Sequence, residues 1–265
     1  MSFHTYMGDV SIVTIFDTTV EKTFERHPGF YAAEVEGLRC CAPFGFTPQV
    51  QLEDPVQRIL TMQRVGACDA LDWMFKHGKH PSAKAALLKM ALLLRKQVTV
   101  LHDNGIYHGD IKLENITFEF SEQDPFTITR LYLIDFATSS FLNKKDPTHR
   151  TVHVSSDFYS SFEAKIGQFR SSKRDDVWSF LTCIYVWVSG GFPLYGRYDF
   201  WYDGFLQWYR NNDVWFWKDV VTYDMLTQGQ SALLKSWFTA VKVQPLEDGV
   251  FELPSEQDLE SLFNA

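Results

Sequence analysis

The chain has 265 residues and a formal net charge of -8, with 45% hydrophobic and 22% charged residues. This composition is too apolar for a disordered chain, and the length suits one large domain or two small lobes. The acidic excess argues against a general binder of nucleic acid or anionic membranes, because both need surplus Lys and Arg. We therefore expect a folded globular protein that binds no nucleic acid.

The cysteines and the N-terminal residues indicate an intracellular protein. The four cysteines form no CxxC pair and are too scattered for a disulfide scaffold: Cys40, Cys41, Cys68 and Cys183. The first ten residues lack the basic start and apolar run of a secretory signal, and no apolar stretch reaches the roughly 18 residues that span a bilayer. We expect no membrane span and a reducing compartment, the cytoplasm or nucleus.

The first half of the chain predicts strands followed by a long helix. Residues 9–24 are rich in β-branched residues and are interrupted by a polar Asp-Thr-Thr, which predicts a strand hairpin. A short helix over 30–41 and a strand over 58–65 follow. Residues 82–102 repeat apolar side chains at helical spacing, with Ser82 as the candidate N-cap.

The second half predicts a small hairpin and then helices. Two strand-like runs over 115–120 and 130–136 are separated by the polar turn SEQDPFT, which favours a hairpin. From residue 177 onward the pattern is mostly helical, and no internal repeat or low-complexity tract is present. The order of elements predicts an α+β protein.

One loop carries the residues of a reactive site. The stretch YHGDIKLENITFEF, residues 107–120, places Asp110, Lys112 and Asn115 between the long helix and the hairpin, and the apolar run LIDF ends downstream on Asp135. Loops held between rigid elements are common sites of chemistry. Two carboxylates and an amide can hold a divalent metal, with one carboxylate left to act as a base. This combination suits phosphoryl transfer.

These residues resemble the eukaryotic-type protein kinase family, whose loop reads H-R-D-x-K-x-x-N and whose second motif reads D-F-G. Here the loop is HGDIKLEN at 108–115 and the second motif is DFA at 135–137. The resemblance implies that Asp110 accepts the proton of the substrate hydroxyl. It also implies that Asn115 and Asp135 hold Mg²⁺ or Mn²⁺, with ATP as the phosphoryl donor.

The same resemblance implies the fold. Lys112 stands where serine/threonine kinases have a lysine that neutralises the transferred phosphoryl group. The expected fold is α+β and bilobal, a single protein kinase-like domain over 1–265. A small, mostly β N-lobe with a short first strand and the hinge would occupy 1–65, and a mainly α-helical C-lobe would occupy 66–265.

Three further segments resemble the family in the expected order. RDDVWSF at 174–180 is similar to the start of the large buried helix of the C-lobe, which would make Asp176 the support of the catalytic loop backbone. An acidic pair at a helix N-terminus, Asp175 and Asp176, is the plainer interpretation, and both can hold at once. SFE at 161–163 resembles the end of the activation segment, and GFP at 191–193 resembles the turn after the buried helix.

The N-terminal part resembles the family less closely. Val20-Glu21-Lys22 is similar to the end of the V-A-I-K motif, which implies that Lys22 binds the nucleotide phosphates and pairs with Glu34, or alternatively with Glu36. An exposed lysine on a strand is the plainer interpretation of Lys22. The hinge residues that would contact the adenine are Met62, Gln63 and Val65, and a buried strand would explain Met62 equally well.

The phosphate-binding loop is degenerate. Gly8 and Val10 resemble only the last part of G-x-G-x-x-G-x-V, and Phe3 and Thr5 stand where glycines are expected. Without glycines the backbone cannot approach the phosphates as closely, so we expect weakened nucleotide binding.

Two departures concern regulation and the metal site. Gly109 replaces the Arg that in many kinases pairs with a phosphate on the activation loop, which predicts an enzyme that needs no loop phosphorylation. Ala137 replaces the Gly of D-F-G, which restricts the backbone but keeps the carboxylate of Asp135.

Two segments suggest protein partners. A basic cluster near the activation segment could receive an acidic or already phosphorylated substrate, or could be a solvated loop: Lys144, Lys145, His149, Arg150, Arg170, Lys173 and Arg174. The aromatic run over 199–219 could form a docking surface for a protein partner, although core packing explains at least half of its rings.

Three functions remain open at this point. The first is an active serine/threonine protein kinase, which the complete set of polar catalytic residues favours. The second is a pseudokinase that binds or regulates another protein, which the missing glycines favour. The third is a small-molecule phosphotransferase of the aminoglycoside or choline kinase type, against which Lys112, SFE and DVWS argue. The short chain also resembles reduced kinases of viruses and bacterial effectors, which implies action inside a host cell.

Overall fold

The fold was obtained as a computed structural model. It describes residues 4–7, 11–25, 28–142, 172–190, 226–242 and 251–264. The segments over 143–171 and 191–225 lie outside the described residues, and with them lie the SFE and GFP motifs, the aromatic run over 199–219 and most of the predicted basic cluster.

The N-terminal part is a five-stranded antiparallel sheet in the order β1-β2-β3-β5-β4. Its strands are β1 (His4–Met7), β2 (Ile12–Ile15), β3 (Thr19–Thr23), β4 (Val50–Asp54) and β5 (Ile59–Gln63). The predicted hairpin over 9–24 is confirmed as β2 and β3, and the strand over 58–65 is confirmed as β5. The four-residue β1 matches the short first strand that the sequence predicts.

One helix packs against this sheet. It is α1 (Pro28–Cys41), followed by the 3-10 turn η1 (Ala42–Phe44). The proline at the first helical position fits because its missing N–H would have no partner there. The helix buries Phe30, Val35 and Leu38 and also the charged Glu34, which marks one face as part of a site.

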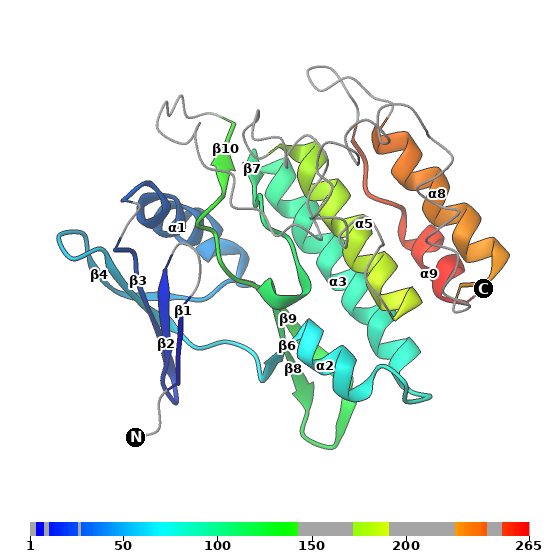
Figure 1. Cartoon of the computed structure of the whole chain (residues 1–265), viewed down its shortest axis with the longest axis horizontal. Helices are drawn as coiled ribbons and strands as arrows, with labels where there is room; N and C mark the ends of the chain where they lie inside the picture. Colours follow the sequence, from blue (N-terminus) through cyan, green and yellow to red (C-terminus); the bar gives the residue numbers. More distant parts are fainter. Residues whose placement is uncertain are drawn as a thin grey trace, which may run out of the picture.

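The remaining part is mainly helical. Its helices are α2 (Ala70–His77), α3 (Ala83–Asp103), α5 (Lys173–Ser189), α8 (Gln228–Lys242) and α9 (Glu256–Asn264). Nearly every residue of α5 is buried, as expected for the central helix of this part, and α3 runs beside it (Figure 1). No helix among the described residues is long and apolar enough to cross a membrane.

The start of α3 differs from the prediction. Ser82 occupies the N-cap position, but its hydroxyl makes no capping hydrogen bond, because its backbone is already helical with φ -77° and ψ -9°. The imidazole Nδ1 of His80 instead accepts from the backbone N–H of Ser82 at 3.2 Å, and the carbonyl of His80 accepts from Ala83 N at 2.9 Å. The cap therefore comes from two residues earlier than predicted.

The predicted hairpin is confirmed as β8 (Ile116–Ser121) and β9 (Asp124–Leu133), and β6 (Cys68–Asp69) pairs with β8. Its turn is only two residues long, shorter than the predicted SEQDPFT. The carboxylate of Asp124 accepts from Phe126 N and Thr127 Oγ1, and irregular register lets pairing continue to Ser121 and Asp124. A small ladder of β7 (Ile106–Tyr107) and β10 (Ser140–Phe141) completes the described strands.

The architecture is the bilobal α+β arrangement that the sequence predicts. The sheet with α1 lies on one side and the helices on the other, and the chain crosses between them after β5 (Figure 1). The loop over 108–115, with the 3-10 turn η2 (Leu113–Asn115), lies between β7 and β8. The lobe boundary after residue 65 stays a prediction.

Candidate active site

Asp176 holds the backbone of the loop that carries Asp110. The side chain of Asp176 is fully buried near the start of α5, and its two oxygens accept from the backbone N–H groups of His108 and Gly109, each at 2.8 Å. The Nε2 of His102 on α3 lies 3.0 Å from the same carboxylate. The predicted support by Asp176 is confirmed, and the capping box between Ser172 and Asp175 shows that the acidic helix start is also real.

Gly109 has a conformational reason to be glycine. Its φ is +80°, in the left-handed region where a Cβ would be strained. Asp176 fixes this conformation through the Gly109 N–H. Glycine therefore relieves backbone strain in the loop, and the expectation that activity needs no loop phosphorylation stays a prediction.

His108 connects the loop to the segment before Asp135. Its Nε2 lies 3.2 Å from the carbonyl oxygen of Ile134, and its Nδ1 accepts from the backbone N–H of Asp110 at 3.3 Å. One neutral tautomer, protonated on Nε2, satisfies both contacts. Burial lowers the pKa of His108 below its ordinary value, against the pull of the carboxylates of Asp176, Asp110 and Asp135.

Asp110 lies at the centre of a compact polar cluster. The amide nitrogen of Asn115 donates to the backbone carbonyl of Asp110 at 2.9 Å and to its Oδ2 at 3.0 Å. The ammonium of Lys112 lies 2.7 Å from the same Oδ2. Burial acts to lower the pKa of Lys112, but the charge of Asp110 and its hydrogen bond outweigh burial and raise it. Lys112 is therefore charged beside the carboxylate.

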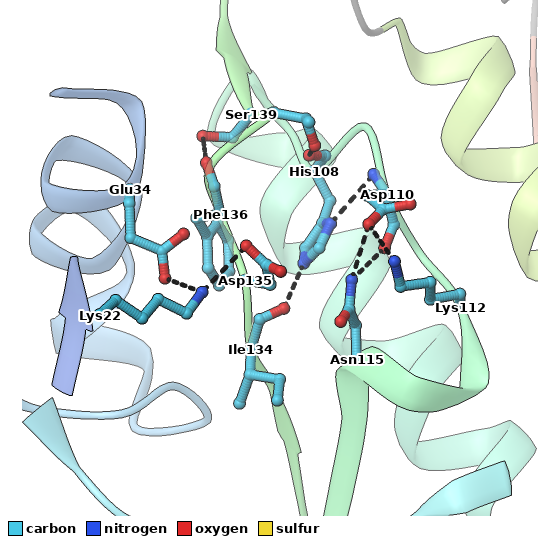
Figure 2. A network of polar contacts seen from close by, with 11 residues as sticks. Lys22, Glu34, His108, Asp110, Lys112, Asn115, Ile134, Asp135, Phe136 and Ser139 are labelled. Atoms are coloured by element: carbon cyan, nitrogen blue, oxygen red, sulfur yellow. Dashed lines mark hydrogen bonds and ion pairs between the residues drawn. The ribbon is translucent and has the colours of Figure 1, made fainter. Parts of the chain in front are cut away.

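Lys22 joins the sheet, α1 and the end of β9. Its ammonium reaches from β3 to Glu34 Oε1 at 3.0 Å and to Asp135 Oδ1 at 2.9 Å, as Figure 2 shows. Lys22 is buried, so the plainer interpretation as an exposed lysine is wrong. Glu34 is the preferred partner, whereas Glu36 accepts from the Cys40 thiol at 3.3 Å.

The charges of this cluster are set by burial and by each other. Burial acts to lower the pKa of Lys22, but the carboxylates of Asp135 and Glu34 overcome it and raise that pKa. Burial acts to raise the pKa of Asp135, and Lys22 with Lys112 and His108 brings it down to about 2. Burial raises the pKa of Glu34 to about 7 against the attraction of Lys22.

Close packing positions α1 against the second motif. Phe136 is fully buried and its ring centroid lies 4.6 Å from that of His108. A Cβ placed on Gly37 would lie 2.6 Å from the Cβ of Phe136, so α1 approaches this residue only because Gly37 has no side chain. Sequence reasoning missed Gly37, because the contact joins residues far apart in the chain. Ala137 is also buried, and Asp135 before the motif has φ +67°.

The donor set fits a small divalent cation. Asn115 uses its amide nitrogen on Asp110, which turns its amide oxygen away from that residue (Figure 2). Asp135 is ionised at neutral pH because its pKa is about 2. Among the described residues no group of three His, Cys, Asp or Glu side chains could hold a metal. Mg²⁺ is commonly held by one or two carboxylates together with substrate phosphates, so Asp135 and Asn115 fit it.

The other predicted nucleotide contacts are only partly described. Met62 is buried on β5, and the N–H of Gln63 is used by the carbonyl of Gln49 at 2.8 Å. No backbone hydrogen bond engages the N–H of Val65 within the part of the chain that the structure describes. Gly8 and Val10 lie outside the described residues.

Comparison with known proteins agrees with this geometry. A family model described as "Protein kinase domain" matches residues 51–211. The chain belongs to the protein kinase family. It is 31% identical over 145 residues to calcium-dependent protein kinase 25 of Arabidopsis thaliana, which covers 55% of this chain and 26% of that protein.

Two other relatives come from an insect and a virus. The ovarian-specific serine/threonine-protein kinase Lok of Drosophila melanogaster is 32% identical over 103 residues, covering 38% of this chain and 20% of that protein. The B1 kinase of vaccinia virus (strain Western Reserve) is 24% identical over 163 residues, covering 59% of this chain and 51% of that protein. The matches thus span from a fifth to about half of the relatives' own lengths.

Proposed function

We propose that this kinase-family protein is an active serine/threonine protein kinase that transfers the γ-phosphate of ATP to a protein hydroxyl. The observation that carries the proposal is the convergence of Lys22, Asp110, Asn115 and Asp135 from separate elements into one site. The named serine/threonine kinases among its relatives support the acceptor class.

Each side chain has a role that its contacts support. Asp110, oriented by Asn115, accepts the proton of the attacking hydroxyl. Lys112, charged and 2.7 Å from Asp110, neutralises the transferred group. Lys22, positioned by Glu34, binds the nucleotide phosphates.

Asn115 and Asp135 would hold Mg²⁺ or Mn²⁺ through oxygen atoms. The bound metal supplies positive charge that offsets the negative charge of the phosphates. Lys22 now occupies one oxygen of Asp135 at 2.9 Å, so we expect the ammonium to shift toward the phosphates when nucleotide binds.

A pseudokinase is the second candidate, and one observation favours it. Thr5 lies inside β1, opposite Thr14 of β2 with their hydroxyl oxygens 3.4 Å apart, where the family has a glycine of its phosphate loop. A paired threonine holds the backbone in a regular strand. The protein-kinase relatives favour a protein acceptor over the small-molecule alternative.

The place of action is also a proposal. All four cysteines are free thiols, which supports a reducing intracellular compartment. The likeness to a vaccinia kinase supports, at family level, action inside a host cell.

The deciding experiment is transfer of labelled γ-phosphate from ATP, with magnesium or manganese, to the protein itself and to acidic and basic protein substrates. We expect transfer by the wild type and its loss in Asp110→Asn and Asp135→Asn. Glu122→Gln, on the exposed hairpin turn, is the control that should keep full activity. Well-folded protein that transfers nothing with either metal would contradict the proposal and favour the pseudokinase.

A further inference from the structure

A cavity of about 550 Å³ lies in the helical part, away from the elements that carry Lys22 and Asp110. It is bounded by α3, α5, α8 and the segment over 251–255 that leads into α9. In Figure 1 this segment passes between α5 and α8. Its volume lies within the roughly 300–1,000 Å³ that ligand sites occupy.

The floor and walls of the cavity are apolar. Leu181, Val241 and Phe251 are buried at the floor, whereas Trp237 and Leu253 are only partly buried. Burying a large apolar side chain is worth about 1.5–3 kcal/mol. An apolar group of a partner would therefore be stabilised here without any change in the fold.

The cavity rim is acidic. Glu252 and Asp258 line it, and Glu256 stands beside it, paired loosely with Arg95 at 3.9 Å. Arg95 is the cation of the lining, and its Nε is already bound to the carbonyl of Pro254 at 2.6 Å. Three carboxylates thus face one guanidinium at this mouth.

Helix capping explains only part of this acidity. Asp258 accepts from the N–H and the hydroxyl of Ser255, and with Glu256 it lies in the first turn of α9, where the helix dipole favours negative charge. Glu252 lies before the helix, is exposed, and makes no hydrogen bond or ion pair within the described residues. Its charge at the mouth is therefore left to attract a cation.

We propose that this cavity docks a segment of a partner protein in which one large apolar side chain is flanked by Lys or Arg. The apolar side chain would fill the space between Trp237 and Leu253, and the basic flank would pair with Glu252 and Glu256. Charge complementarity selects this occupant, because an acidic rim repels anionic segments and phosphates. The proposal is independent of whether the protein transfers phosphate.

The test uses the full chain and an array of nine-residue peptides. Each peptide carries Leu, Phe or Trp at its centre, with Lys, Glu or Ser at the flanking positions, and binding is measured by fluorescence anisotropy. We expect Lys-flanked peptides to bind. Ala240→Trp, which fills the cavity from an exposed position on α8, should weaken their binding at least about tenfold, the size of one hot-spot contact.

Charge variants give the matched comparison. Glu252→Lys should weaken Lys-flanked peptides several-fold and increase the binding of Glu-flanked ones, while Glu122→Lys on the distant hairpin turn should change neither. Glu252 is exposed, so its variant should fold even if Ala240→Trp does not. Binding that Ala240→Trp and Glu252→Lys leave unchanged belongs to another surface and overturns the proposal. Equal binding of all flanks, or a dimer that Ala240→Trp abolishes, would overturn it as well.

Discussion

The contact between Gly37 and Phe136 predicts that a single methyl group on α1 disturbs the active site. In Gly37→Ala the new Cβ would lie 2.6 Å from the Cβ of Phe136, whereas carbon atoms pack best at about 3.5–4.0 Å. The helix must therefore retreat by roughly 1 Å. Glu34 lies one turn away on the same helix, and such a shift would lengthen its 3.0 Å contact with Lys22 beyond hydrogen-bonding distance.

The free energies have opposite signs and can be compared. Ala gains about 1 kcal/mol over Gly in a helix, while overpacking a core costs about 1–3 kcal/mol. We expect Gly37→Ala to lose about 1 kcal/mol of unfolding free energy in urea titrations and to lower phosphoryl transfer.

Gly29→Ala is the matched control for this prediction, because nothing lies within 4 Å of its new Cβ in the same helix. It should be neutral or stabilising, with unchanged transfer. If Gly37→Ala behaved like Gly29→Ala in both assays, the close-approach argument would be refuted.

Three further variants test the supports of the site. Asp176→Asn places an amide against buried N–H donors and should cost about 3 kcal/mol in urea unfolding, whereas Asp175→Asn, a capping change, should cost about 1 kcal/mol; equal losses would contradict the special role of Asp176. His108 has a pKa below its ordinary 6.5, so the unfolded chain binds its proton more readily. This residue therefore removes stability as pH falls below about 6.5, and unfolding of His108→Gln at pH 7.5 and 5.5 should show a smaller loss than the wild type. Lys22→Met should destabilise the fold by leaving buried carboxylates unpaired, and adding Glu34→Gln should restore part of the loss; additive losses in the double-mutant cycle would contradict this coupling.

Local spacing explains what the sequence could predict of the site. Asp110, Lys112 and Asn115 lie within one short loop, so the family motif fixes their arrangement without knowledge of the fold. Asp135 follows an apolar strand, which places it at a strand end. The partner of Lys22 was predicted as Glu34 because helical periodicity from Leu38 indicated the buried face of α1.

The missed elements depend on tertiary contacts. β4 was not predicted because its residues QLED alternate weakly, and its pairing with β5 contains a register shift. α2 was not predicted because eight residues are too few for a periodic signal, although Asp69 caps it through the N–H of Asp72. The long β9 was cut short because DPFT carries turn residues, which irregular pairing accommodates.

The candidate site is held together by buried packing between the two parts of the molecule rather than by its loops. Lys22 comes from the sheet and Asp135 from the helical part, so their 2.9 Å contact exists only while these parts keep their spacing. Phe136 sets that spacing, because it is buried between α1 and the ring of His108. The backbone of His108 is in turn fixed by Asp176 from α5. Since every step in this series is buried, solvent cannot replace a lost contact, and the geometry of the charged residues depends on residues that never touch a substrate.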